Sequence, residues 1–261
     1  METISDRFRL DGKIALVSGG AGIVGFPIVR ALSEAGATVI CASRDGEKCR
    51  QVAAYMVKEG RRVVGLACDF ADASALRALR DQILQKHGHL DVLINNAVAR
   101  AGGDLRNATA EEWEESMKLN STGLFLSCQI FSEPMQAQRS GSIINIGSIY
   151  GMVGPTFSIY EGTPLSNPIN YAFSKGGLIN LTRYLASWLG PYNVRVNSLS
   201  PGGFESEGQG DAFRANYSKH EPLGRLAKGE DIQGPVVFLA SDASRYITGV
   251  NIPVDGGWTA I

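Results

Sequence analysis

Tyr171 and Lys175 are the residues whose types and spacing point most directly to chemistry. They lie four positions apart, so in a helix they would share one face. A free tyrosine has a pKa of about 10 and is a poor base at neutral pH, but a lysine ammonium beside it favours the phenolate. Such a tyrosine can carry a proton to or from an alcohol oxygen. Because this spacing also arises by chance on many helices, its weight depends on the elements around it.

A glycine-rich turn near the N-terminus supplies the second signal. Residues 19–25, Gly-Gly-Ala-Gly-Ile-Val-Gly, follow an apolar run at 13–18 and precede a helical pattern. A strand, a glycine-rich turn and a helix in this order open a dinucleotide-binding βαβ unit. The glycines let the backbone turn tightly and approach a pyrophosphate, which the positive end of the helix dipole attracts. The segment therefore predicts a dinucleotide site.

Apolar runs alternate with helical patterns along the whole chain. Continuous Val/Ile runs indicate strands buried on both faces, as in parallel sheets covered by helices. We predict an α/β fold in one domain, residues 1–261: a doubly wound, mostly parallel seven-stranded sheet of Rossmann type with helices on both faces. Thr109 and Glu112 form a capping-box pattern that opens a central helix. The predicted strands are Ile14–Val17, Val39–Ala42, Val63–Ala67, Val92–Ile94, Ile143–Ile146, Val194–Leu199 and Asn251–Val254.

Taken together, these features resemble the short-chain dehydrogenase/reductase family, in the single-domain form of gluconate 5-dehydrogenases and 3-oxoacyl-carrier-protein reductases. The resemblance extends from about Leu10 to Trp258. It implies an NAD(P)-dependent oxidoreductase that interconverts a secondary alcohol and a ketone. Besides the glycine-rich turn and the Tyr–Lys pair, the matching motifs are Cys68-Asp69, Asn95-Asn96-Ala97, Asn120, Ser148 and the segments 193–202, 238–242, 247–249 and 254–257.

The resemblance assigns catalytic roles to four residues. Tyr171 would be the general acid/base, and Lys175 would lower its pKa and hydrogen-bond the nicotinamide ribose. Ser148 would donate a hydrogen bond to the substrate oxygen and stabilise the charge that develops there. Asn120 would hold a water that links Lys175 to solvent. Taken singly, Ser148 could instead cap a strand end, and Asn120 could bond the backbone of its own helix.

The resemblance also implies a set of cofactor contacts, from Asp69 at the adenine to the segment 201–206 at the nicotinamide. Two positions depart from the family pattern: Ile23 replaces a glycine of the turn, and Val98 replaces the glycine that usually follows Asn-Asn-Ala. Both indicate an adjusted cofactor site with intact catalytic groups. The expected cofactor-binding residues are Gly19, Ala21, Gly22, Ile23, Gly25, Ser43, Arg44, Asp69, Phe70, Asn96, Ala97, Val98, Tyr171, Lys175, Pro201, Gly202, Phe204 and Ser206.

The end of the second predicted strand bears on the choice of cofactor. NAD-binding sites place an acidic residue there for the ribose hydroxyls, whereas a basic residue accommodates the phosphate of NADP. Here Ser43 imposes no repulsion, and Arg44 offers a planar cation suited to phosphate. The alternative is a surface arginine paired with Asp45 or Glu47. We expect NADP(H) to be preferred, with NAD(H) as the second cofactor.

Tyr171 follows Ser148 by 23 positions, a longer separation than is typical of the family. We expect an insertion at about 155–169, whose prolines, glycine and hydroxyls favour a structured loop at the mouth of the active site. Alternatively, this loop faces solvent or another subunit. A second variable element, at about 204–222, resembles the family's substrate lid, with Arg214, Tyr217 and His220 as polar members. The candidate substrate contacts are Ser148, Tyr160, Glu161, Thr163 and Gly203.

Composition excludes several other classes of protein. The chain has 25 basic and 26 acidic residues and a net charge of −1, so no basic face indicates nucleic acid or an anionic membrane. The N-terminus lacks a signal-peptide pattern, and no apolar stretch is long enough to span a membrane. Four scattered cysteines and three histidines form no metal-binding pattern. We expect free thiols, no metal and a cytoplasmic location.

The expected substrate is a small molecule, namely a sugar, a sugar acid or a polyol, because the insertion is rich in polar side chains. Within the family, the alternative is a 3-oxoacyl-carrier-protein reductase. In a different class, it is a non-catalytic protein that senses nicotinamide nucleotides, although a sensor would not need the proton relay. The resemblance also implies a homo-oligomer, specifically a tetramer, because long helices of the family pair across a two-fold axis and a stripe of leucines follows Lys175. Alternatively, this stripe packs only on the chain's own sheet. Its members are Leu178, Leu181, Leu185 and Leu189.

Overall fold

The computed structural model describes residues 3–100 and 102–261. Its strands are β1 Ile14–Ser18, β2 Thr38–Ser43, β3 Val63–Ala67, β4 Val92–Asn95, β5 Gly141–Ile146, β6 Val194–Pro201 and β7 Asn251–Val254. Its α-helices are α1 Gly25–Glu34, α2 Gly46–Lys58, α3 Ala73–His87, α4 Ala110–Met117, α5 Leu124–Gln138, α6 Ile169–Leu189, α7 Gly210–His220 and α8 Gly229–Ala240.

The strands form one seven-stranded parallel sheet in the order β3-β2-β1-β4-β5-β6-β7. The predicted doubly wound sheet is therefore confirmed. Each strand begins and ends within two residues of the predicted positions. The order reverses between β1 and β4, where Val17 pairs with Cys41 on one side and with Ile94 on the other. Ligands of such sheets bind at this reversal, outside the carboxyl ends of the strands.

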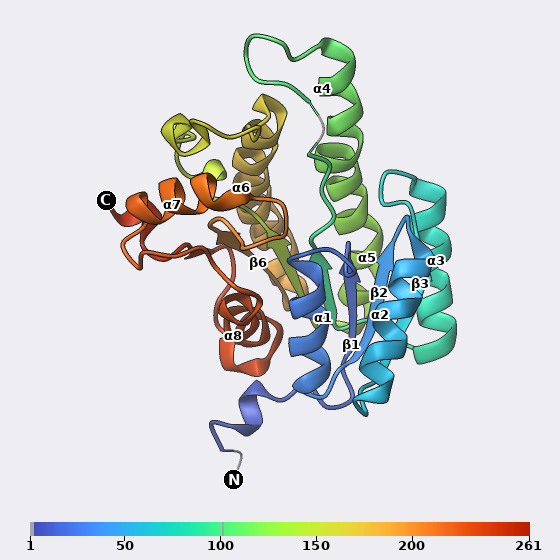
Figure 1. The fold of residues 1–261 in the computed structure, drawn as a ribbon. Helices are drawn as coiled ribbons and strands as arrows, with labels where there is room; N and C mark the ends of the chain where they lie inside the picture. The colour runs from blue at the N-terminus through green and yellow to red at the C-terminus, as the bar shows by residue number, and fades with distance from the viewer. Residues whose placement is uncertain (1–2, 101) are drawn as a thin grey trace.

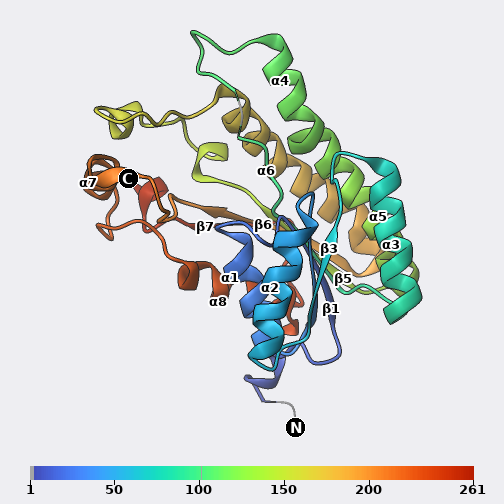
Figure 2. The ribbon, with the colours of Figure 1, turned by 45° about the vertical axis from the view of Figure 1, so that its right-hand side comes forward.

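Helices cover both faces of the sheet (Figures 1 and 2). The packing of α1, α2 and α8 encloses one apolar core, and that of α3, α5 and α6 encloses the other. In strand β1, neighbouring side chains point to opposite faces of the sheet. Because an apolar core covers each face, the strand has no alternating polar residues. Val17 enters the first core and Leu16 the second, and both are fully buried.

Helix α4 begins at the predicted capping box. The Thr109 hydroxyl accepts from the Glu112 amide, and the Glu112 carboxylate accepts from the Thr109 amide, each at 3.2 Å. After α4 the chain forms a π-helical segment, Lys118–Gly123, before it continues as α5. Such wide turns often occur at functional sites. Here the π-helical segment contains Asn120.

The insertion lies beside α7 at the carboxyl edge of the sheet, where Figures 1 and 2 show its short 3-10 helix, Phe157–Tyr160. Asn216 donates a hydrogen bond to the Glu161 carbonyl at 3.1 Å, and the Tyr160 ring lies 5.8 Å from that of Phe213. Side chains of α7 thus hold the inserted loop against the rest of the protein.

Within residues 3–100 and 102–261, no helix is long and apolar enough to cross a membrane. No group of three or more potential metal ligands occurs among these residues either. The four cysteines are buried free thiols.

Candidate active site

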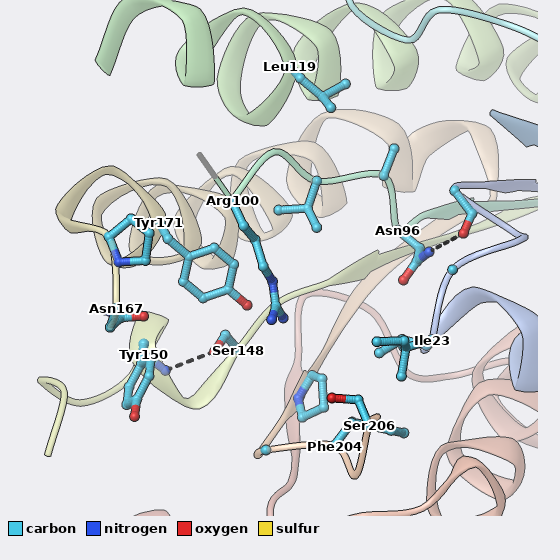
Figure 3. A pocket seen from close by; sticks show the side chains of 18 of the residues that line it. Ile23, Asn96, Arg100, Leu119, Ser148, Tyr150, Asn167, Tyr171, Phe204 and Ser206 are labelled. Carbon is cyan, nitrogen blue, oxygen red and sulfur yellow. Dashed lines mark hydrogen bonds between the residues drawn. The ribbon is translucent and has the colours of Figure 1, made fainter. Parts of the chain in front are cut away.

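A pocket of about 960 Å³ opens at the carboxyl ends of the central strands. Figure 3 shows two ends of it: Ile23 and Asn96 lie at one, Asn167 and Tyr150 at the other, and Ser148, Arg100 and Tyr171 lie between them. Of the residues expected to bind a cofactor, all line this pocket except Gly25 and Lys175. The pocket is large enough for a dinucleotide together with a small substrate.

The glycine-rich turn is built for close backbone packing. Gly19 has a positive φ of 62°, which favours glycine. A Cβ on Gly25 would lie 2.1 Å from the Gly19 carbonyl oxygen, so Gly25 lets α1 begin against the turn. The Asn96 amide fixes the turn by donating to the carbonyls of Ser18 at 3.1 Å and Gly19 at 3.0 Å. Ile23 is 61% exposed at the pocket mouth, so the departure from glycine causes no buried clash.

Two cations lie where the second strand meets the pocket. Arg44 is exposed, lines the pocket and makes no ion pair within the part of the chain that the structure describes. Asp45 instead caps α2 by accepting from the Lys48 amide at 3.0 Å, and Glu47 pairs with Arg50 at 2.7 Å. The alternative in which Arg44 pairs with either acid is therefore not seen. Lys48 also lines the pocket, and the sequence analysis did not identify it.

Tyr171 and Lys175 lie on one face of α6, as their spacing predicted, and both are buried. The Lys175 Nζ is 5.6 Å from the centroid of the Tyr171 ring and donates to the Ile146 carbonyl at 2.6 Å. Burial alone would raise the pKa of Tyr171, but the charges of Lys175 and Arg100 and a hydrogen bond from Ser148 lower it. Burial lowers the pKa of Lys175 as well.

Asn120 is buried in the π-helical segment and binds the loop after β4. Its side chain accepts from the Ala99 amide and donates to the Ala99 carbonyl, both at 2.8 Å, and also donates to Ser116 at 3.0 Å. It thus bonds a different loop as well as its own helix. A second cavity of about 20 Å³ lies between Asn120 and Lys175. Such a cavity can hold about one water, given polar partners.

Only some candidate substrate contacts reach the pocket. Ser148, Tyr160 and Gly203 line it, whereas Glu161 and Thr163 do not. Glu161 is exposed, and the Thr163 hydroxyl donates to the Tyr160 carbonyl at 2.8 Å.

Of the polar lid members, Tyr217 lines the pocket and accepts from the Gly203 amide, while Arg214 donates to the Ser206 carbonyl at 3.3 Å. His220 lies outside the lining and contacts Ser158 of the insertion at 3.3 Å. The lid and the insertion are therefore connected by side chains on the outer side of the pocket.

Arg100 is a central residue of the pocket that the sequence analysis missed. Its guanidinium carbon lies 5.1 Å from the centroid of the Tyr171 ring. Figure 3 shows the side chain pointing into the pocket between Tyr171 and the turn that carries Phe204. Its position in the sequence could have identified it: it lies two residues after the Asn-Asn-Ala-Val segment, on the loop that leaves β4.

A Rossmann sheet with a dinucleotide-sized pocket beside a buried Tyr–Lys pair is the architecture of a nicotinamide-dependent oxidoreductase. Comparisons agree with this class. A family model described as enoyl-(acyl carrier protein) reductase matches residues 19–259. A D-threitol dehydrogenase from Mycolicibacterium smegmatis is 32% identical over 260 residues, which cover 97% of this chain and 95% of that protein.

Two further relatives extend the range of activities. A 3-oxoacyl-(acyl-carrier-protein) reductase from Aquifex aeolicus is 33% identical and is matched over 95% of this chain and 98% of its own. The structure of a gluconate 5-dehydrogenase from Burkholderia cenocepacia in complex with NADP and tartrate has a TM-score of 0.90 and 31% identity, covering 99% of this chain and all of that one. The chain belongs to the short-chain dehydrogenase/reductase family, as its sequence predicted.

Proposed function

We propose that this protein is an NADP-preferring dehydrogenase that interconverts a secondary alcohol and a ketone on a sugar acid or a related hydroxy acid. The observation that carries the proposal is the buried group of Ser148, Tyr171 and Lys175 with the Arg100 guanidinium beside it. The first three residues are suited to proton transfer at an alcohol oxygen. The fourth adds a positive charge that would attract a substrate carboxylate.

The proton chemistry follows from the contacts of Tyr171. A bound nicotinamide would accept or supply the hydride. In the direction of alcohol oxidation, the Tyr171 phenolate takes the hydroxyl proton, because nearby cations stabilise the phenolate. Ser148 donates to the same substrate oxygen. The proton then leaves past Lys175 and the cavity beside Asn120, which has room for one water.

Arg100 distinguishes a sugar acid from the other candidate substrates. It is always charged and presents several donors in one plane, which suits a carboxylate. Arg100 is exposed where it enters the pocket, so salt should weaken this attraction. Neutral sugars and polyols would leave the guanidinium without an anionic partner, so the structure favours the acid among the three classes that the sequence left open.

Arg44 and Lys48 support the preference for NADP. Both line the end of the pocket formed by the second strand, and Arg44 makes no ion pair among the described residues. Two cations near Ser43 fit the extra phosphate of NADP. The gluconate 5-dehydrogenase that shares this fold was solved with NADP.

A panel of substrates tests the proposal, with absorbance of the reduced nicotinamide as the readout. The panel holds 5-keto-D-gluconate, L-erythrulose, acetoacetate, 2-butanone and acetoacetyl-coenzyme A, each with NADPH and NADH. We expect 5-keto-D-gluconate to have the highest kcat/KM. The thioester tests the second candidate, a 3-oxoacyl reductase, which the Aquifex aeolicus relative favours. A clear preference for the thioester would replace the proposed function.

The role of Arg100 has its own test within this panel. Arg100→Ala should lower the ratio of kcat/KM for acetoacetate to that for 2-butanone by about tenfold or more, the effect of losing a charge-assisted hydrogen bond. The ratio cancels any effect on Tyr171 that both substrates share. An unchanged ratio with a raised Kd for NADPH would assign Arg100 to the cofactor instead.

We also propose a homo-oligomer, in a reducing cytoplasm that fits the free thiols. Leu178 and Leu189 of the leucine stripe are buried in the protein's own interior. The outward face of α6 instead carries Phe173, Tyr184 and Trp188, each more than 60% exposed. Large exposed aromatic side chains on one helix mark an interaction surface. Sedimentation should show a species larger than 27.9 kDa, and Trp188→Glu should reduce its size.

A further inference from the structure

The insertion forms the end of the pocket that lies farthest from Ile23 and Asn96 (Figure 3). Two tyrosines contribute there: the hydroxyls of Tyr150 and Tyr160 lie 3.1 Å apart. Burial raises the pKa of Tyr150, so its hydroxyl stays protonated. One of the two hydroxyl protons suffices for the bond between them, so the pair keeps a second donor.

Asn167 is a buried polar side chain of this region with no hydrogen bond to the described residues around it. It lines the pocket beside Tyr150 and is only 7% exposed. Its amide makes no hydrogen bond to any residue in 3–100 or 102–261. Its polar atoms are not among the enclosed, unpaired atoms of the described residues, so they are accessible from the pocket that Asn167 lines. A polar group of a bound molecule can therefore pair with this amide without competing with a protein partner.

The backbone fixes Asn167 relative to the catalytic tyrosine. The ring of Pro168 restricts the preceding residue to extended conformations. The Pro168 carbonyl then accepts from the Tyr171 amide at 3.1 Å as α6 begins. One residue on, the Ile169 amide donates to the Gly103 carbonyl at 3.1 Å. Asn167 is thus held in place one helical turn before Tyr171 and is preorganised for a ligand.

We propose that Asn167, together with the Tyr150–Tyr160 pair, forms a subsite that binds a substrate hydroxyl beyond the reacting carbon. An amide can donate to a hydroxyl and accept from it at the same time. Leu165 and Phe213 also line this end, so the amide and the phenols are polar groups beside an apolar wall. The subsite selects polyhydroxylated substrates over simple ketones. It rests on the proposed function, because it concerns the substrate of the same Tyr171.

Two four-carbon ketones isolate the effect of substrate hydroxyls. L-Erythrulose carries hydroxyls next to its carbonyl, and 2-butanone carries none. Asn167→Leu keeps the side-chain size but removes the amide. We expect it to lower kcat/KM for erythrulose at least tenfold and to change that for 2-butanone less than twofold. Asn167→Ser, which restores a hydrogen-bonding group, should recover part of the loss.

Glu161→Gln is the matched control, because Glu161 belongs to the same insertion but is exposed outside the pocket lining. It should leave both ketones unaffected. An equal loss on both ketones in Asn167→Leu would assign Asn167 a structural role and overturn the proposal. Unaltered kinetics on erythrulose would overturn it as well.

A binding measurement separates this proposal from the proposed function. If the wild-type protein oxidises NADPH with none of the ketones, the proposed function fails, and the subsite is tested by calorimetry with threitol and 2-butanol in the presence of NADP⁺. Asn167→Leu should then weaken threitol binding at least tenfold and leave 2-butanol unaffected. Equal threitol affinity in both proteins, or no binding to the wild type, would overturn the subsite.

Discussion

The proposed cofactor end and the proposed substrate end of the pocket (hereafter the cofactor end and the substrate end) are built in different ways. The cofactor end uses the carboxyl ends of regular strands and a glycine turn, whose Ser18 and Gly19 carbonyls Asn96 holds. The substrate end uses two irregular segments, the insertion and the lid, joined by side chains such as Tyr160 and Phe213. Binding a cofactor that many related enzymes share needs only the regular construction of the cofactor end. We expect selection among substrates to depend on the irregular segments of the substrate end, whose length and side chains can differ between relatives.

The largest effect is expected where the two ends meet. Tyr171→Phe removes the oxygen that transfers the proton but keeps the ring, so kcat should fall by about 10³-fold. The Kd for NADPH, measured by fluorescence titration, should change little, because the ring still fills its buried position. Retention of more than a few per cent of wild-type kcat would contradict the assignment of Tyr171 as the general acid/base.

At the cofactor end, Arg44→Ala should weaken NADPH binding by about 1.5–3 kcal/mol, the range for a hydrogen bond to a charged group. NADH binding should be unchanged, because NADH lacks the phosphate. Lys48→Ala is the companion variant: the Lys48 ammonium is exposed and lies 3.6 Å from the Asp45 carboxylate, so we expect a smaller loss of the same kind. Titration of both nucleotides decides this. Equal losses for NADPH and NADH would make Arg44 a structural residue.

The sequence predicted the regular part of the molecule well. The strands could be located because buried parallel strands are continuous apolar runs, and the four-residue spacing placed Tyr171 and Lys175 on one face of α6. Arg100 and Asn167 could not be found in this way, because their positions depend on the path of irregular loops. Polarity singled out Glu161 instead, but the pairing of the insertion with α7 leaves that side chain in solvent.

Helix α6 shows a related limit of periodicity. The leucine stripe could form a subunit contact or pack on the chain's own sheet, and Leu178 and Leu189 are buried within the protein's own interior, as the second alternative expects. A helical apolar stripe cannot by itself distinguish a core from an interface, since both exclude water in the same way. The exposed aromatic residues Tyr184 and Trp188 identify the outward face only once the structure is known.

The smallest effect we expect concerns stability at the substrate end. Glu221 follows α7 and is 6% exposed, with its Oε2 lacking a hydrogen bond among the described residues. Burial, together with the negative charge of Asp255, raises the pKa of Glu221 to about 7, although Arg225 acts in the opposite direction and Asp231 adds to the rise. The folded protein therefore holds this proton more tightly than the unfolded chain does, and stability falls as the pH rises from about 4.5 to about 7.

Glu221→Gln keeps the shape of the side chain and removes the titration. At pH 8 it should raise the free energy of unfolding by on the order of 1–2 kcal/mol relative to the wild type, and at pH 5 it should make little difference, since the wild-type carboxyl is then protonated in the folded state. Thermal or urea unfolding at both pH values measures this. Glu207→Gln, an exposed change on the same lid segment, is the control and should leave the free energy of unfolding nearly unchanged. A gain for Glu221→Gln that is the same at pH 5 and pH 8 would show that the charge of Glu221 does not destabilise the fold.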